Sequence, residues 1–286
     1  MAVDLHIHTV ASGDGEFSPQ AIIRFAKEKE LETIAITDHD SVDSVEEAIY
    51  LGEKCGIEVI PACEFSSRYQ DTWLHILGYF LDYKSPEISD WCANIAKNRL
   101  DNVDVQIDKL QEAGLYMDKE EFLKNNPQPM PICYGKALFE DIRNKNNKLL
   151  EPYREMDNRL VQFALDWLVS GRPYNVPQEL PAVEDVINLI INNGGIPVLA
   201  HPAVTLGTSS DDLISKFLSL GIQGIEASTS WHQKEEQDYY LQFCQKKNIL
   251  ATCGSDFHGS SKPNIALGQV ENNSNDVVEQ LKRLKK

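Results

Sequence analysis

Histidine is scarce in this chain and is concentrated at one kind of position. Six of the seven histidines lie inside, or just after, short apolar runs that are typical of β-strands. In a parallel α/β fold the carboxyl ends of the strands meet at one edge, so these imidazoles are predicted to share one site. The six residues are His6, His8, His39, His75, His201 and His258.

The motifs around these histidines indicate metal chemistry, although each has a simpler alternative. His6 and His8 point to the same face of a strand, and paired imidazoles suit one metal ion. Two hydrogen-bonded structural histidines would show the same spacing. Asp38-His39-Asp40 follows an apolar run, where an acid can orient the imidazole. The alternative for Asp40, or for Ser41, is a helix cap.

Acidic residues follow the apolar runs as well. Glu64 ends such a run, where a buried carboxylate needs a cation or hydrogen bonds, although a solvated surface glutamate is the alternative. Asp256 and His258 are bounded by glycines, which allow the backbone to approach a ligand closely. His75 alone also fits a buried core histidine. Together, imidazole and carboxylate without thiolate suit zinc, manganese or iron(II).

The composition limits the function classes. With 286 residues and 42% hydrophobic content, the chain can bury a large core. Its formal net charge of −17 argues against an extended nucleic-acid surface, so any phosphate site must be local. The chain shows no signal-peptide pattern and no membrane-spanning apolar run, which predicts a cytoplasmic protein. The scattered cysteines are predicted to be reduced, buried and outside the site: Cys55, Cys63, Cys92, Cys133, Cys244 and Cys253.

Apolar runs alternate with helical patterns over most of the chain, which predicts a parallel sheet covered by helices, either open or closed into a barrel. The predicted strands are Val3–Ile7, Thr33–Thr37, Ile57–Ala62, Leu74–Tyr79, Ile196–Ala200, Gly224–Ala227 and Ile249–Thr252. The predicted helices are Ser18–Glu30, Ser41–Lys54, Ala182–Asn192, Ser209–Leu220 and Lys234–Lys247.

The alternation is interrupted between about Asp82 and Val176, where the sequence predicts helices and loops and contains no histidine. A helical insertion between the fourth and fifth strands explains this pattern, and we expect it to form a lid or wall over the site. The predicted helices are Pro86–Leu115, Lys119–Lys124, Tyr134–Lys145 and Glu155–Val169.

At these motifs the sequence resembles the PHP (polymerase and histidinol phosphatase) family. The matching segments are Asp4–Thr9, Ile36–Asp40, Ile60–Glu64, Leu74–Tyr79, Val198–Pro202 and Gly254–Gly259. The stretch from Gly171 to Pro177 is similar to the branch of nucleoside 3′,5′-bisphosphate phosphatases and exoribonucleases. The resemblance implies an α/β fold, a distorted (β/α)7 barrel formed by residues 1–81 and 177–286, with residues 82–176 as a helical insertion and substrate lid.

The resemblance also implies two or three divalent metal ions, of zinc, manganese or iron, with magnesium possible at one site. It implies a first metal held by His6, His8, Glu64 and Asp256, and a second that shares Glu64 and is also held by His75 and His201. A third would be held by His39, His258 and an acid from the loop after His8. That loop is one residue longer than the family pattern, so both Asp14 and Glu16 are candidates.

Such a site would be strongly cationic within an acidic protein. Three carboxylates contribute about −3 and three divalent ions about +6, which leaves about +3 for phosphate binding. Metal ions can activate water at phosphorus, so no amino-acid nucleophile is required. The predicted catalytic residues are Glu64, Asp256 and His232. His232 would be a substrate contact or general acid, and the alternative is a histidine at the start of a helix.

The predicted substrate is a small phosphorylated molecule, a nucleotide phosphomonoester such as a nucleoside 3′,5′-bisphosphate, hydrolysed by metal-activated water. Arginine and lysine are the usual phosphate donors. The candidates are Arg68, Lys136, Arg143, Arg172 and Lys262, each of which is otherwise a solvated surface cation. The alternative functions are a 5′-to-3′ exonuclease on short RNA, a histidinol phosphatase and an inactive metal-binding barrel.

Overall fold

A single seven-stranded sheet organises the molecule. The computed structural model describes residues 2–285, and its strands follow one another in the sheet in the order in which they occur in the chain. All seven predicted strands are confirmed. They are β1 (Ala2–Ile7), β2 (Leu31–Ile36), β3 (Glu58–Tyr69), β4 (Thr72–Tyr79), β5 (Ile196–Leu199), β6 (Gly224–Thr229) and β7 (Leu250–Gly254).

The prediction of a purely parallel sheet is wrong at one strand. β4 pairs antiparallel with both β3 and β5, whereas the other neighbouring strands pair in parallel. β3 also continues past the predicted end at Ala62 and forms a hairpin with β4, because only two residues, Gln70 and Asp71, separate the strands. His75 therefore lies within β4, opposite Ser66, rather than at a carboxyl end.

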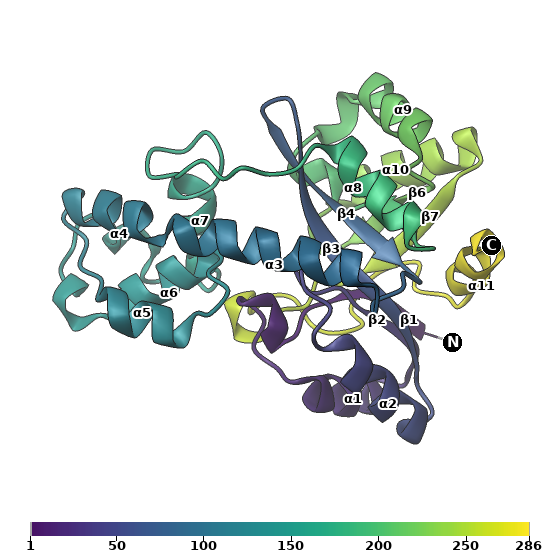
Figure 1. Ribbon diagram of the computed structural model, residues 1–286, viewed down its shortest axis with the longest axis horizontal. Helices are drawn as coiled ribbons and strands as arrows, with labels where there is room; N and C mark the ends of the chain where they lie inside the picture. The colour runs from purple at the N-terminus through teal and green to yellow at the C-terminus, as the bar shows by residue number, and fades with distance from the viewer. Residues whose placement is uncertain (1, 286) are drawn as a thin grey trace.

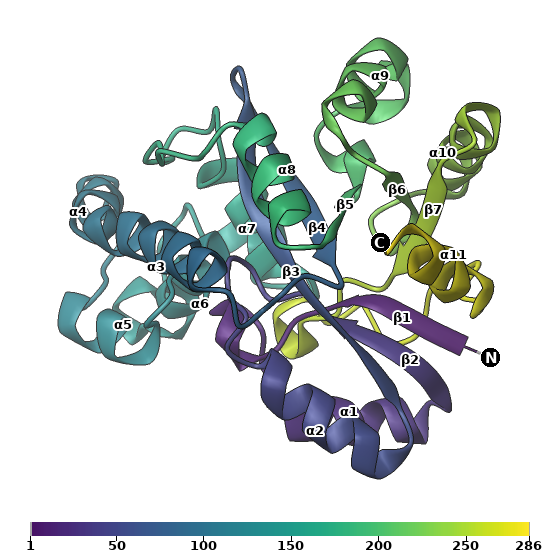
Figure 2. The same cartoon turned by 45° about the vertical axis from the view of Figure 1, so that its right-hand side comes forward.

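The sheet curls until its first and last strands meet. A parallel bridge joins Ile7 to Phe257, the amide of Asp256 donates to the carbonyl of His6 at 2.8 Å, and the amide of His8 donates to the carbonyl of Phe257 at 3.0 Å. The predicted distorted (β/α)7 barrel is thereby confirmed (Figure 2). These contacts also bring the segment after β7 against the histidines of β1.

Helices cover the outside of the barrel, as Figure 2 shows. They are α1 (Pro19–Glu28), α2 (Val45–Cys55), α8 (Val183–Asn192), α9 (Asp211–Leu220) and α10 (Lys234–Lys247). Helix α2 begins after Ser44, so neither Asp40 nor Ser41 caps it. A further helix that the sequence did not predict, α11 (Asp276–Leu284), lies against β7 and adds Val278 and Leu281 to the hydrophobic cluster that contains Val3 and Leu250.

Helices α3 to α7 occupy the segment between β4 and β5; α4 to α7, on the left in Figure 1, share a hydrophobic cluster of their own, whereas α3 contributes Ile88 and Cys92 to a cluster that it shares with the barrel. The five helices are α3 (Pro86–Asp101), α4 (Val103–Glu112), α5 (Lys119–Asn125), α6 (Pro131–Glu140) and α7 (Arg159–Trp167). The single helix predicted for residues 86–115 is interrupted at Asn102. No helix among residues 2–285 is long and apolar enough to cross a membrane.

The cysteines follow the prediction with one exception. All six are free thiols, and five of them are buried. Cys55, at the end of α2, is exposed. No cysteine belongs to the groups of potential metal ligands that the described residues form.

Candidate metal centre

Three groups of histidine and carboxylate side chains converge at one end of the barrel. In each group the potential ligand atoms lie within 4.8 Å of one another. The groups are His6, His8, Glu64 and Asp256; His39, Glu64 and His75; and His8, Asp14, His39 and His258. The residues come from β1, β3, β4, the loop after β1 and the segments that follow β2 and β7.

Glu64 is the centre of this arrangement. Its carboxylate is fully buried, and both of its oxygens face imidazole nitrogens. The distances are 2.8 Å from Oε1 to His75 Nδ1, 2.9 Å from Oε1 to His201 Nε2, 3.0 Å from Oε2 to His39 Nδ1, and 3.2 Å from Oε2 to both His6 Nε2 and His8 Nε2. Glu64 therefore belongs to two of the three groups.

The donor atoms fit divalent cations because, although imidazole and carboxylate atoms lie close together, many of them have no partner with hydrogen-bond geometry. A buried polar atom without a partner is costly, and metal coordination is one way of satisfying it. Eight such atoms belong to the converging groups: His6 Nε2, His8 Nε2, His39 Nδ1, His75 Nδ1, His258 Nε2, Asp14 Oδ1, Glu64 Oε2 and Asp256 Oδ1. Imidazole and carboxylate ligands suit zinc, manganese and iron.

The carboxylates of the site are held in their ionised form. Burial disfavours the charge on Glu64, but His75, His39 and His6 outweigh burial and hold the pKa of Glu64 well below its usual value. Burial likewise disfavours the charge on Asp256, and there Lys262 is the largest opposing influence on the pKa, which is also well below its usual value. Both carboxylates are thus ready to bind cations.

The imidazoles divide into two kinds. Burial, together with neighbouring imidazoles, lowers the pKa of His75 to about 4, so His75 is neutral at pH 7. Burial by itself would also lower the pKa of His8. The charges of Asp256 and Glu64 outweigh burial and raise the pKa of His8 to about 9. Metal binding at His8 must therefore release a proton.

The loop after β1 brings Asp14 to the site. Asp14 Oδ2 lies 3.6 Å from His258 Nε2 and 3.9 Å from His39 Nε2. The alternative acid, Glu16, is exposed, and its Oε2 accepts a hydrogen bond from the amide of Ser260 at 2.5 Å. The geometry of the third ligand group thus favours Asp14.

Residues near α6 hold this loop in place. Gly13 has a φ of +82°, and a Cβ at this position would lie 1.9 Å from the carbonyl oxygen of Gln128. The thiol of Cys133 donates to the carbonyl of Gly13 at 3.3 Å. The conformation of the Asp14 loop thus depends on a segment more than a hundred residues away in the sequence.

Several residues that orient the ligands escaped the sequence analysis. Glu226 in β6 is fully buried, with Oε1 2.9 Å from His6 Nδ1, and its Oε2 accepts from the amide of His201 at 2.8 Å. Ser12 Oγ lies 2.8 Å from His8 Nδ1. The indole nitrogen of Trp231 donates to Asp256 Oδ2. For Glu226, the signal in the sequence was an acid inside an apolar run.

The two acids beside His39 have other partners. Asp38 accepts hydrogen bonds from the amide and the hydroxyl of Thr9, at 2.6 and 2.7 Å. Asp40 accepts from the amide of Ser66 at 2.9 Å and forms a buried ion pair with Arg99. Neither acid contacts the His39 ring, so the prediction that one of them orients it is wrong. Asp38 binds Thr9, and Asp40 binds Ser66 and Arg99.

His232 is buried and uses both ring nitrogens in contacts with the backbone. Its Nδ1 lies 3.0 Å from the carbonyl oxygen of Ala227, and its Nε2 accepts from the amide of Ala203 at 3.2 Å. Burial lowers the pKa of His232 below its usual value. In this conformation His232 holds the turn after His201, and it is not among the converging ligand groups.

The predicted phosphate donors lie in different places. Lys262 is buried, and its Nζ lies 2.8 Å from Asp256 Oδ2 and 4.9 Å from the centre of the Trp231 ring. Arg172 is exposed on the loop that follows α7. Arg143 is exposed and pairs with Asp141. Lys136 is exposed on α6.

Two adjoining pockets open at the rim. The smaller, the metal pocket, has a volume of about 110 Å³ and combines His201 and members of the converging groups, such as Asp14 and Asp256, with Trp231, Lys262 and apolar residues of α6 and α7. The larger, the arginine pocket, has a volume of about 660 Å³ and is lined by Arg68, Arg99 and Arg172. Both pockets share four lining residues: Trp73, His75, Pro131 and Val169.

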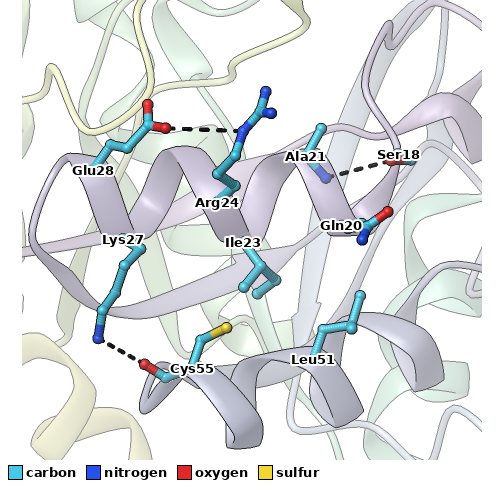
Figure 3. Close-up of a pocket in the computed structure, with 9 residues that line it drawn as sticks. All are labelled: Ser18, Gln20, Ala21, Ile23, Arg24, Lys27, Glu28, Leu51 and Cys55. Atoms are coloured by element: carbon cyan, nitrogen blue, oxygen red, sulfur yellow. Dashed lines mark hydrogen bonds and ion pairs between the residues drawn. The ribbon is translucent and has the colours of Figure 1, made fainter.

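A third hollow, of about 600 Å³, lies on the outside of the barrel between α1 and α2 (Figure 3). There Lys27 Nζ donates to the carbonyl of Cys55 at 2.8 Å, and Arg24 lies 3.8 Å from Glu28. Its lining contains none of the converging ligands. This hollow is therefore separate from the candidate metal centre.

Solved structures share this fold. An amidohydrolase from Chromobacterium violaceum, solved with bound sulfate and no metal, superposes with a TM-score of 0.84 at 23% identity and covers 99% of this chain and 96% of its own. A protein from Bifidobacterium adolescentis classed as a metal-dependent phosphoesterase gives a TM-score of 0.80 at 23% identity, with coverages of 98% and 94%.

Curated relatives match along most of their length. A phosphoribosyl 1,2-cyclic phosphate 1,2-diphosphodiesterase from Eggerthella lenta is 26% identical over 91% of this chain and 95% of its own. A 3′,5′-nucleoside bisphosphate phosphatase from Chromobacterium violaceum is 25% identical, with coverages of 94% and 91%. A 5′-3′ exoribonuclease from Haemophilus influenzae is 27% identical and covers 89% of each chain.

A barrel that gathers buried imidazole and carboxylate groups at one end is typical of metal-dependent hydrolases. The sequence model of the PHP domain matches residues 4–151, which is more than half of the chain. The chain therefore belongs to the PHP domain family, as its motifs predicted, and it is a hydrolase of phosphoester bonds.

Proposed function

We propose that the protein removes a phosphate group from a small nucleotide, such as a nucleoside 3′,5′-bisphosphate. The observation that carries the proposal is the convergence of buried imidazole and carboxylate atoms that lack hydrogen-bond partners, next to a pocket large enough for a nucleotide. The bisphosphate phosphatase among the relatives supports this substrate class.

Two or three divalent ions, of zinc, manganese or iron, fit the proposed ligand set. His6, His8, Glu64 and Asp256 would hold the first ion, and Glu64 would bridge it to a second held also by His75 and His201. Asp14, His39 and His258 would hold the third. Such ions would supply an activated water and positive charge for displacement at phosphorus, with magnesium possible at one of the sites.

The side chains around the ligands bind and orient the substrate. Lys262, buried in the metal pocket, is positioned to donate to a phosphate oxygen. Trp231 fixes the second oxygen of Asp256. The amide of Ala203 donates to Nε2 of His232. For His232 to act as a general acid, the turn that carries Ala203 would have to move away from this nitrogen.

The segment 82–176 would select the substrate as a wall over the rim. Ile132, Val161 and Ala164, from α6 and α7, form a buried cluster against which Trp231 packs. Pro131 and Val169 line both pockets. These contacts support a domain that shapes the pocket without supplying metal ligands.

A phosphate-release screen tests this function. Purified protein loaded with Mn²⁺ should release phosphate from adenosine 3′,5′-bisphosphate faster than from histidinol phosphate. Faster cleavage of a ribose 1,2-cyclic phosphate or of a short 5′-phosphorylated RNA would replace the proposed substrate with those of the other relatives. Absence of both phosphate release and phosphodiester cleavage with every substrate, the latter followed by chromatography of the products, and with Zn²⁺, Mn²⁺ and Fe²⁺ each tested, would identify an inactive metal-binding barrel.

A further inference from the structure

The β3–β4 hairpin leads from the metal ligands into the arginine pocket. Directly opposed residues of an antiparallel pair share a face of the sheet. The pairs Ser66–His75 and Arg68–Trp73 follow each other on the face that carries Glu64. Arg68 thus lies four residues beyond the proposed bridging ligand, about 13 Å along the strand. Figures 1 and 2 show the hairpin projecting past the barrel.

The loop that precedes α8 forms the other side of this pocket. The amide of Arg68 donates to the carbonyl of Pro181 at 2.8 Å, and Arg68 forms a parallel bridge with Ala182. Arg172 lines the pocket from the same loop. Two arginines from separate segments therefore face one space.

The charge of the pocket is opposite to that of the protein. The chain has 44 acidic and 27 basic residues, yet the charged lining of the pocket consists of three arginines and Asp71. Asp40 neutralises Arg99 in a buried ion pair. Arg68 and Arg172 form no ion pair within 4.0 Å among residues 2–285, so they leave an excess of positive charge.

We propose that Arg68 and Arg172 bind a second phosphate of the substrate, distinct from the phosphate that the metal ligands hold. Trp73, half-buried where the two pockets join, would contact the group that links the phosphates. A planar guanidinium matches the oxygens of a phosphate in a bidentate manner. The identity of this ligand rests on the proposed function, and the pocket makes a bisphosphorylated nucleoside the preferred substrate over a monophosphate.

The kinetic test compares three substrates: adenosine 3′,5′-bisphosphate, adenosine 3′-monophosphate and adenosine 5′-monophosphate. The manganese-loaded wild-type protein should show a kcat/KM for the bisphosphate at least tenfold above that for either monophosphate. The double variant Arg68→Ala/Arg172→Ala should lower the value for the bisphosphate about 10- to 100-fold and those for the monophosphates less than threefold. Arg24→Ala, on the outside of α1, is the matched control and should change none of them.

A binding measurement separates this proposal from the proposed function. Isothermal titration of metal-free protein with adenosine 3′,5′-bisphosphate should give a Kd that rises at least tenfold in the double variant and stays unchanged in Arg24→Ala. If the loaded enzyme releases no phosphate but this difference is found, the proposed function fails and the second-phosphate site stands. A Kd that is equal in wild type and double variant, absence of binding to the wild type, or an equal loss of activity on all three substrates would overturn the site.

Discussion

Glu226 and His6 form a buried carboxylate–imidazole pair, with 2.9 Å between Glu226 Oε1 and His6 Nδ1. With Nδ1 donating to Glu226, Nε2 of His6 would offer its lone pair to a cation bound beside Glu64 and Asp256, whose oxygens lie 3.2 and 3.3 Å from Nε2. The second oxygen of Glu226 accepts from the amide of His201. One carboxylate below the site thus orients ligands of two proposed metal positions.

Replacing Glu226 with Gln should weaken metal binding about 10- to 100-fold, which is typical of changes to groups that orient metal-bound histidines. The glutamine amide can donate to His6, so it no longer fixes the tautomer. Competition with a chromophoric chelator measures the affinity. Glu58→Gln, which alters contacts with Lys282 and Thr33 away from the site, is the control. Equal affinities in wild type and Glu226→Gln would show that Glu226 does not orient the ligands.

Glu64→Gln should lower kcat/KM more than any single surface substitution, because a bridging carboxylate acts on two ions at once. Steady-state kinetics at saturating metal provide the measurement. Glu46→Gln, at an exposed position of α2, is the surface comparison. A loss below about tenfold, or roughly 1.4 kcal/mol of transition-state stabilisation, is incompatible with a bridging role.

Acid should destabilise the metal-free protein partly through His75. Its pKa of about 4 in the folded state is below the ordinary 6.5, so the unfolded chain binds the extra proton first. The contribution of neutral His75 is present above pH 6.5 and is lost as the pH falls towards 4, by at most ~3 kcal/mol. Urea unfolding at pH 7 and pH 4.5 should show a smaller loss for His75→Gln than for wild type. If the free energies of unfolding of the two proteins differed by the same amount at pH 7 and at pH 4.5, the prediction would be contradicted.

Gly13→Ala should impair the third ligand group. The new Cβ would collide with the carbonyl of Gln128, and the loop that carries Asp14 would move. Gly56→Ala is the matched control because Gly56 also has a positive φ, +71°, but a Cβ there meets nothing within 4 Å. Elemental analysis after equilibration with excess Mn²⁺ and removal of the unbound ions should find about one ion fewer in Gly13→Ala only. An equal metal content in both variants would show that Asp14 holds no ion.

The sequence predicted the strands because each is a short apolar run. It also predicted that the histidines at these runs lie together, as His6, His8, His39, His75 and His258 do. Strand direction could not be predicted in the same way. Apolar content is the same for a parallel and an antiparallel strand, so the reversal of β4 became visible only in its pairing. The continuation of β3 through Ser66, Ser67 and Arg68 was hidden because these polar residues are typical of a loop.

Contacts between distant segments were likewise inaccessible to local patterns. Glu226 meets His6 across 220 residues of sequence, and Cys133 meets Gly13 across 120. Arg143 was a plausible phosphate donor by type alone, yet it pairs with Asp141 on the surface. Residue type indicates what a side chain can bind, whereas the fold decides which partner it meets.

Stepwise addition of Mn²⁺ to chelated protein, with phosphate release from adenosine 3′,5′-bisphosphate as the readout, tests the central claim most directly. The metal-free protein should be inactive, and activity should rise until two or three ions are bound per chain, because the ligands converge in overlapping groups. Phosphate release that persists at the wild-type rate in fully metal-free protein would contradict a metal-dependent mechanism at this site.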